Sequence, residues 1–145
     1  MPNRLLLSAS QHETLLEAAS KAWPKECCGL LIGQENDDGE ALLVERIIPS
    51  PNIAQPPESR FEIDPAIRIR LEKELRGGKS RIIGHYHSHP DGPPRPSPRD
   101  TEQIYEPELI WLIIGMDVNG EEKLAAFLPS TEGKCFTQLI ISEIA

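Results

Sequence analysis

The sequence predicts one α/β domain with mixed strand order, and two features of the chain lead to this class. First, segments with the two-residue period of strands alternate with segments of helical period along the chain. Second, 145 residues of which 39% are apolar suit one hydrophobic core, and the chain has no internal repeat and no low-complexity tail. We therefore expect residues 1–145 to form a single domain.

The first part of the chain predicts a strand, a helix and a strand hairpin. Residues 4–7 form a short opening strand. Ser10 with Glu13 has the spacing of a capping box, so a helix is expected to start there and to end before Pro24. Its apolar stripe consists of Leu15, Leu16, Ala18, Ala19 and Ala22. Two apolar strands, 29–33 and 41–48, flank the polar turn 36–39, and the proline-rich segment 49–59 predicts a loop.

The second part predicts two helices between further strands. After a short strand at 61–63, Asp64 and Pro65 are typical of a helix start, and Gly77-Gly78 marks the end of that helix. Its buried face consists of Ile67, Leu71 and Leu75. Ser97-Pro98 starts a shorter helix that is expected to reach about residue 105. The remaining predicted strands are 81–87, 109–114, 123–128 and 136–141.

Composition argues against several functions. A net charge of −8 with scattered acidic residues does not provide the basic face that a nucleic-acid partner requires. The apolar run at 5–7 is too short for a secretory signal, and no later run reaches the roughly 20 residues of a membrane span, so we expect a cytoplasmic protein without a membrane partner. Cys27, Cys28 and Cys135 lack the spacing of a disulfide framework and are expected to be reduced thiols.

The clearest chemical signature is the segment Gly84-His85-Tyr86-His87-Ser88-His89-Pro90. Residues two apart on an extended segment point to the same side, so His87 and His89 can reach one ion. The proline-rich loop 88–96 then returns Asp100 on the first turn of a helix. Two imidazoles, one carboxylate and a fourth position for water are typical of a catalytic zinc site, so the pattern favours hydrolysis over a structural clip.

Two other interpretations of this region stay open from the residues alone. His85 lies on the same side as His87 and His89, so spacing does not decide which pair binds the metal. Cys27 and Cys28 permit a Cys-His hydrolase, although cysteines beside a core strand are usually inert.

The run His87-Ser88-His89-Pro90, six residues, Ser97, two residues, Asp100 resembles the signature of the JAMM (MPN-plus) metallopeptidases at every motif position. The family also carries a glutamate ahead of a glycine-containing strand, and Glu26 before 29–33 is similar. The segment Arg60-Phe61-Glu62-Ile63-Asp64-Pro65 resembles the short bacterial members. The resemblance implies the MPN/JAMM, cytidine-deaminase-like fold, which is a mixed, curled β-sheet flanked by helices.

The resemblance also implies a role for each motif residue. His87, His89 and Asp100 would bind Zn2+, Glu26 would act as the general base, and Ser97 would steady the developing oxyanion. This favours the pair His87 and His89 and leaves His85 as a neighbour.

Three of these residues have ordinary structural alternatives. Glu26 could be a surface carboxylate at a strand entry. Ser97 suits a helix N-cap, and both roles can coexist. Asp100 would be favourable near the positive end of a helix even without a metal.

Members of the family cleave amide or isopeptide bonds after the C-terminal Gly-Gly of ubiquitin-like proteins, and some short bacterial members release cysteine from a sulfur-carrier tail. The resemblance therefore implies a zinc metallopeptidase whose partner is a small ubiquitin-like or sulfur-carrier protein. Such a narrow, extended tail could pair with an exposed sheet edge. The alternatives are a non-enzymatic MPN-type interaction scaffold, in which ligand positions are lost, and a zinc amidohydrolase acting on a small molecule.

Overall fold

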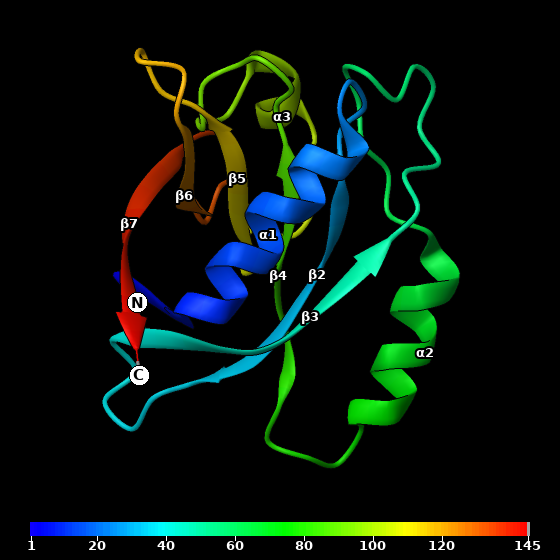
Figure 1. The fold of residues 1–145 in the computed structure, drawn as a ribbon. Coiled ribbons are helices and arrows are strands. Elements are labelled where there is room, and N and C mark those ends of the chain that lie inside the picture. Colours follow the sequence, from blue (N-terminus) through cyan, green and yellow to red (C-terminus); the bar gives the residue numbers. More distant parts are fainter. Residues whose placement is uncertain (145) are drawn as a thin grey trace.

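The computed structural model describes residues 1–144 of the chain (Figure 1). Within them, seven strands and three helices follow one another. They are β1 (Arg4–Ser8), α1 (Ala9–Ala22), β2 (Cys28–Glu35), β3 (Ala41–Ser50), α2 (Pro65–Leu75), β4 (Arg81–Ser88), α3 (Pro98–Glu102), β5 (Ile110–Met116), β6 (Glu122–Pro129) and β7 (Phe136–Ile144). The predicted α/β class is confirmed.

The strands form a closed barrel in the order β1-β3-β2-β4-β5-β6-β7. The pairs β1–β3, β1–β7 and β4–β5 are parallel, and the other neighbours are antiparallel, so the sheet is mixed as predicted. The expected curled sheet is in fact closed, because Arg4–Ser8 pairs with residues 140–144. Each of the strands in residues 1–144 therefore has two neighbours. Strand β1 pairs with β3 only at residues 41–43, however, so residues 44–50 of β3 pair with β2 alone. The expected pairing of a tail with an exposed sheet edge stays a prediction.

Helix α1 starts two residues earlier than predicted. The Ser8 side chain accepts a hydrogen bond from the Gln11 N–H at 3.1 Å, and the Gln11 side chain accepts one from the Ser8 N–H at 2.9 Å. This capping box replaces the predicted one at Ser10 and Glu13 because the same spacing occurs twice, and Ser8 follows directly from β1. Ser10 lies inside the helix, where its carbonyl accepts from the Thr14 hydroxyl.

The other two helices begin where the sequence predicts. Asp64 caps α2 by accepting from the Ala66 N–H, and Ser97 caps α3. Helix α3 ends at Glu102, which is earlier than the predicted residue 105. No helix among residues 1–144 is both long and apolar enough to cross a membrane.

The predicted strand at 61–63 is wrong. Only Ile63 forms a β-bridge, with Asn52, and the Ile53 N–H donates to the Glu62 carbonyl at 3.1 Å. The Asn52 side chain makes further hydrogen bonds with the backbone around it. Asn52 accepts from the Glu62 N–H at 3.0 Å and donates to the Arg60 carbonyl at 2.8 Å. An asparagine that replaces a neighbouring strand in this way leaves no signal in a strand periodicity.

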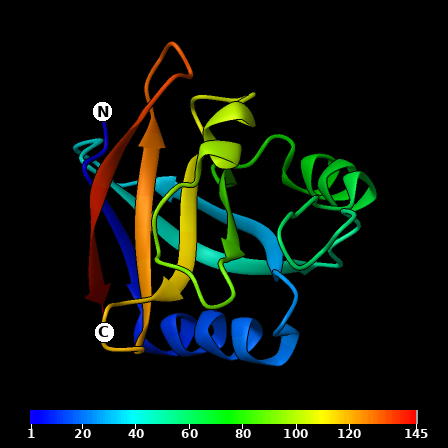
Figure 2. The same cartoon turned by 90° about the horizontal axis from the view of Figure 1, so that it is seen from above.

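Side chains that alternate along the central strands fill separate apolar clusters. On β2, Leu31 belongs to the cluster that includes Leu15 of α1, while Leu30 and Ile32 pack with Leu71 of α2. Figure 2 shows α1 and α2 on different sides of the strands. A further cluster around Trp111 and Phe127 lies on β5 and β6. Strand β4, which carries His85 and His87, contributes Ile83 to the first of these clusters and Ile82 to the second, so it packs on both faces.

Candidate active site

Strand β4 delivers two histidines to one point. His87 is fully buried near the end of β4, and the half-buried His89 follows directly after the strand. The main chain stays beside β5 here because the His89 N–H donates to the Ile114 carbonyl at 2.8 Å. The Nε2 atoms of His87 and His89 face each other at 3.0 Å. The two-residue spacing has placed both rings on one side, as predicted.

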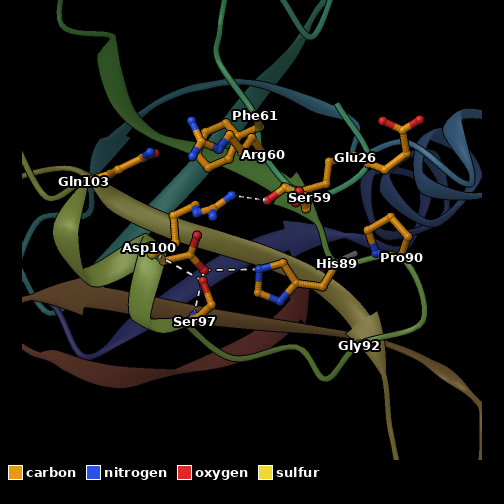
Figure 3. A pocket seen from close by; sticks show the side chains of 12 residues that line it. Glu26, Ser59, Arg60, Phe61, His89, Pro90, Gly92, Ser97, Asp100 and Gln103 are labelled. Atoms are coloured by element: carbon orange, nitrogen blue, oxygen red, sulfur yellow. Dashed lines mark hydrogen bonds and ion pairs between the residues drawn. The ribbon is translucent and has the colours of Figure 1, made fainter. Parts of the chain in front are cut away.

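Helix α3 brings Asp100 to the same point (Figure 3). Its Oδ2 atom lies 3.1 Å from His89 Nε2, and its Oδ1 atom lies 3.5 Å from His87 Nε2. Ser97 fixes the carboxylate, since the Ser97 N–H donates to Asp100 Oδ2 at 2.8 Å. In return the Ser97 hydroxyl oxygen accepts from the Asp100 N–H at 3.1 Å. One capping box therefore both starts the helix and orients the carboxylate.

These three side chains fit a metal ion. One ligand atom from each lies within 4.8 Å of the others. Burial lowers the pKa of His87, which keeps its imidazole unprotonated as a metal ligand must be. Burial alone would raise the pKa of Asp100, but the hydrogen bonds with His87 and His89 hold it well below its usual range, so the carboxylate is ionised.

The loop after β4 orients the ring of His89. Its Nδ1 atom lies 2.9 Å from the Pro93 carbonyl oxygen, which can only accept a proton, so Nδ1 donates and Nε2 is left free to bind a metal. The loop is held against β5 by the Met116 N–H, which donates to the Gly92 carbonyl at 2.7 Å. Gly115 permits this approach, because a Cβ atom there would lie 2.6 Å from the Pro93 carbonyl carbon.

The ring of His87 is held by aromatic packing. Phe61 stacks on it with ring centroids 4.1 Å apart, and Trp111 meets it edge-on at 5.6 Å. Its buried Nδ1 atom has no hydrogen-bond partner in residues 1–144. Because no hydrogen bond holds the Nδ1 side of this ring, Phe61 and Trp111 supply the packing that orients that side.

Glu26 lies just before β2 and is 6% exposed. The Glu26 N–H donates to the Pro57 carbonyl at 2.8 Å, and the Glu26 carbonyl accepts from the Asn52 side chain at 3.0 Å. Burial raises the pKa of its carboxyl to about 7. The alternative of an exposed surface carboxylate is therefore wrong. A buried carboxyl with a pKa near neutrality has the property that a general base needs.

Glu26, His89 and Asp100 line one pocket of about 240 Å³. Figure 3 shows Glu26 on the side of this pocket away from α3. Glu58, Ser59, Arg60, Phe61, Pro90, Gly92, Ser97, Arg99 and Gln103 complete the lining. The pocket thus places a candidate base and a candidate metal centre in contact with the same small volume.

The neighbours that the sequence left undecided lie outside the metal cluster. His85 packs edge-on against Trp111 at 4.6 Å, and burial lowers its pKa to about 3. Burial also raises the pKa of Cys27, and that of Cys28 to about 12, so neither thiol forms a thiolate readily. The Cys28 sulfur lies instead 3.8 Å from the Ser50 carbonyl. This geometry favours His87 and His89 as the metal-binding pair and does not support a Cys-His hydrolase.

Two histidines and an aspartate that converge beside a buried glutamate, on a small α/β domain, define the class of hydrolytic metal sites with three protein ligands. The profile of the family described as prokaryotic homologs of the JAB domain matches residues 8–128. The chain belongs to this family, which confirms the resemblance to the JAMM metallopeptidases.

The comparisons also identify individual relatives. The chain is 32% identical to a desampylase of Haloferax volcanii over 79% of this chain and 83% of that protein. It is 36% identical to a probable TtuB-protein conjugate cleaving protease of Thermus thermophilus over 69% of this chain and 60% of that protein. Identity to a CysO-cysteine peptidase of Mycobacterium tuberculosis is 24%, over 76% of this chain and 72% of that protein.

The solved structures confirm the fold. A solution structure of a Desulfitobacterium hafniense protein is 32% identical and superposes with a TM-score of 0.78, covering 97% of this chain and 94% of that chain. This protein and that solved structure therefore share their fold along almost the entire chain.

The structure brings His87, His89, Asp100 and Ser97 together and places Glu26 on the same pocket, while the role of each stays a prediction. The sequence did not predict the residues that orient the ligands, which are Phe61, Pro93, Trp111 and Gly115. Phe61 belongs to the segment that resembles the short bacterial members, and this was the available signal for it. A backbone carbonyl such as that of Pro93 leaves no side-chain signal at all.

Proposed function

We propose that this protein is a zinc-dependent metallopeptidase that hydrolyses an amide or isopeptide bond at the C-terminal tail of a small ubiquitin-like or sulfur-carrier protein. The convergence of His87, His89 and Asp100 within 4.8 Å carries this proposal. Relatives named for cleaving a protein conjugate and for releasing cysteine from CysO support the choice of substrate class. A cytoplasmic location and the absence of a nucleic-acid partner stay predictions.

Zinc is the metal that suits this donor set best. Two imidazole nitrogens and one carboxylate oxygen leave one of four tetrahedral positions for water, which is the arrangement of catalytic zinc. When bound, zinc would supply Lewis-acid chemistry by polarising the water and the scissile carbonyl. His87, His89 and Asp100 would hold it, with the Pro93 carbonyl fixing the tautomer of His89.

Glu26 would move the proton. Its carboxylate accepts a proton from the attacking water and gives it to the leaving amine nitrogen, and a pKa of about 7 suits both transfers near neutral pH. The Ser97 hydroxyl oxygen already accepts from the Asp100 N–H, so its own O–H is free to donate. That O–H would stabilise the negative charge that develops on the carbonyl oxygen as water adds to the carbonyl carbon.

Neither alternative function is supported to the same degree. A scaffold of this fold has no need of the ligand set, whereas His87, His89 and Asp100 are all present and their donor atoms converge. A small-molecule amidohydrolase would keep the metal and change only the substrate. The names of two relatives, a probable TtuB-protein conjugate cleaving protease and a CysO-cysteine peptidase, favour a carrier tail.

The decisive experiment measures metal content and hydrolysis on the same samples. Wild-type protein, His89→Ala and Glu26→Gln are purified, reconstituted with zinc and assayed on a carrier-type tail that ends in Gly-Gly joined to an amine. We expect one zinc per chain in the wild type and in Glu26→Gln, no retained zinc in His89→Ala, and hydrolysis by the wild type alone. A wild-type chain that takes up no zinc and cleaves no tail would favour the scaffold instead.

A further inference from the structure

The pocket beside the candidate metal centre has a charged rim. Arg60, Arg99 and Glu58 line it, and all three side chains are exposed. Arg99 sits on the first turn of α3, next to Asp100 in the chain. Arg99 and the proposed metal ligand Asp100 therefore belong to the same helix.

The guanidinium of Arg99 reaches the loop on the facing side of the pocket. Its Nη1 atom donates to the Ser59 carbonyl on the facing loop, and the distance of 3.4 Å makes this a long hydrogen bond. Arg99 forms no ion pair within the part of the chain that the structure describes. The Arg99 guanidinium makes only this weak hydrogen bond with a neutral group. It can therefore leave the Ser59 carbonyl and bind an anionic group of a ligand instead.

Arg99 starts from α3, but its guanidinium reaches toward the side of the pocket that carries Glu26. In the proposed reaction Glu26 gives its proton to the departing nitrogen, so this nitrogen must lie beside Glu26. The Arg99 guanidinium contacts the Ser59 carbonyl, and Ser59 is two residues along the chain from Pro57, whose carbonyl accepts from the Glu26 N–H. Arg99 and Glu26 also line the same pocket. A group attached close to the departing nitrogen is therefore within the field of Arg99.

The two kinds of amide differ in what is attached to the departing nitrogen. An amino acid joined through its α-amino group carries its carboxylate one carbon away from that nitrogen. In a lysine isopeptide the nitrogen is Nζ, four methylenes from the backbone, and the carboxyl carbon of that lysine is itself part of a peptide bond. Guanidinium binds a carboxylate through two parallel hydrogen bonds.

We propose that Arg99 binds the α-carboxylate of a leaving amino acid, so that this peptidase prefers a carrier tail ending in Gly-Gly plus one amino acid over a lysine isopeptide. The inference rests on the proposed function. The amide C–N bond breaks, water supplies hydroxyl to the carbonyl carbon and a proton to the nitrogen, and the products are the carrier carboxylate and a free amino acid. Arg99 takes no part in these proton transfers and acts on specificity.

The test compares tails that differ only in the terminal group. Three substrates share one Gly-Gly carrier tail and end in cysteine with a free carboxylate, in cysteine carboxamide, or in an isopeptide to lysine. kcat/KM is measured for zinc-loaded wild type, Arg99→Gln, Arg99→Lys, Arg60→Gln and Arg95→Gln. Arg95 is an exposed arginine in the loop just before α3, and it does not line the pocket, so Arg95→Gln is the matched control.

We expect the wild type to prefer the free carboxylate over the carboxamide and the isopeptide by about 10- to 100-fold, which is the usual range for a hydrogen-bonded charge. Arg99→Gln should lose this preference through a lower rate on the carboxylate tail, with the carboxamide rate unchanged. Arg99→Lys should restore part of it. Arg60→Gln and Arg95→Gln should keep the ratio whatever their effect on absolute rates.

A binding measurement separates this inference from the proposed function. The carboxylate and carboxamide tails are titrated into Glu26→Gln and into Glu26→Gln combined with Arg99→Gln. Tighter binding of the carboxylate tail that disappears with Arg99→Gln supports the inference even if neither tail is cleaved, in which case the proposed hydrolysis is what fails. Equal binding of both tails, or a preference that Arg99→Gln keeps, overturns the role of Arg99 and leaves hydrolysis untouched.

Discussion

Phe61 lies almost parallel to the imidazole of His87, with 11° between the ring planes and 4.1 Å between the centroids. His89 owes its orientation to a hydrogen bond with Pro93, whereas His87 has only ring packing on its Nδ1 side. The two proposed ligands are thus held by different physical means. Metal affinity should respond to each of them separately.

Replacing Phe61 should weaken metal binding without removing a ligand. In Phe61→Ala the His87 ring can rotate, and zinc affinity is expected to fall about 10-fold or more, in the range seen when outer groups around metal ligands are lost. The zinc affinity of Phe61→Leu should lie between that of the wild type and that of Phe61→Ala. Competition with a chromophoric chelator measures the affinity. Phe136→Leu is the control, because Phe136 packs on Trp111 at 5.2 Å in the same cluster. Equal zinc affinity in wild type and Phe61→Ala would show that packing does not orient His87.

Gly115→Ala should loosen His89 from a distance. A methyl group at this position would lie 2.7 Å from the Gly92 carbonyl oxygen and would push the proline loop, and with it the Pro93 carbonyl, away from β5. We expect weaker zinc binding and a loss of about 1–3 kcal/mol in the free energy of unfolding. Gly78→Ala is the matched control, since a Cβ there meets the Leu75 carbonyl oxygen at an ordinary 3.5 Å. Unchanged zinc affinity in Gly115→Ala would contradict the coupling between β5 and His89.

Ser97 should show two separable effects. Ser97→Ala removes the N-cap of α3 and is expected to cost about 1 kcal/mol of stability. It also removes the proposed oxyanion donor, for which a loss of roughly 10²-fold or more in kcat is typical. Ser97→Thr keeps the hydroxyl and should preserve most of the stability and most of kcat. Urea unfolding and turnover are measured on the same preparations, and a variant that loses stability but keeps kcat would confine Ser97 to capping.

Glu26→Gln should stabilise the metal-free protein in a pH-dependent way. Burial raises the pKa of Glu26 from 4.5 to about 7, so between these values the folded state holds a proton that the unfolded state has released. Stability of the wild type therefore falls as pH rises through this window, and above pH 7 the full cost of a buried carboxylate is present. Glutamine carries no charge and avoids that cost.

The expected gain for Glu26→Gln is up to about 3 kcal/mol at pH 8 and near zero below pH 4.5. Urea unfolding with a chelator present, at pH 5 and pH 8, measures it. Glu58→Gln, which removes an exposed carboxylate from the same pocket, is the control. A gain that is the same at both pH values would mean that the ionisation of Glu26 is not what destabilises the fold.

Local chemistry explains what could be predicted from the sequence. The caps at Asp64 and Ser97 follow from side chains that satisfy the first N–H groups of a helix, and the pair His87 and His89 follows from the two-residue repeat of a strand. The family resemblance selected these two histidines over His85. Each of these features depends on residues close together in the chain.

What could not be predicted depends on distant residues. The pairing of β1 with β7 joins opposite ends of the chain, and Phe61 reaches His87 from a segment in which Asn52 replaces a neighbouring strand. The start of α1 could not be predicted for a different reason. Ser8 with Gln11 and Ser10 with Glu13 both have the spacing of a capping box, and only the end of β1 decides that Ser8 is the N-cap.

The pairing of β1 with β7 also has a consequence for folding. Arg4 and Ser142, which hydrogen bond across this seam, are 138 residues apart, and contacts of such long range form slowly. The strands and helix that carry the proposed metal ligands all lie in the interior of the sequence, so they can assemble during synthesis. The barrel itself closes only when the last strand has left the ribosome, and until then β1 and β6 present open edges on which two nascent chains can associate.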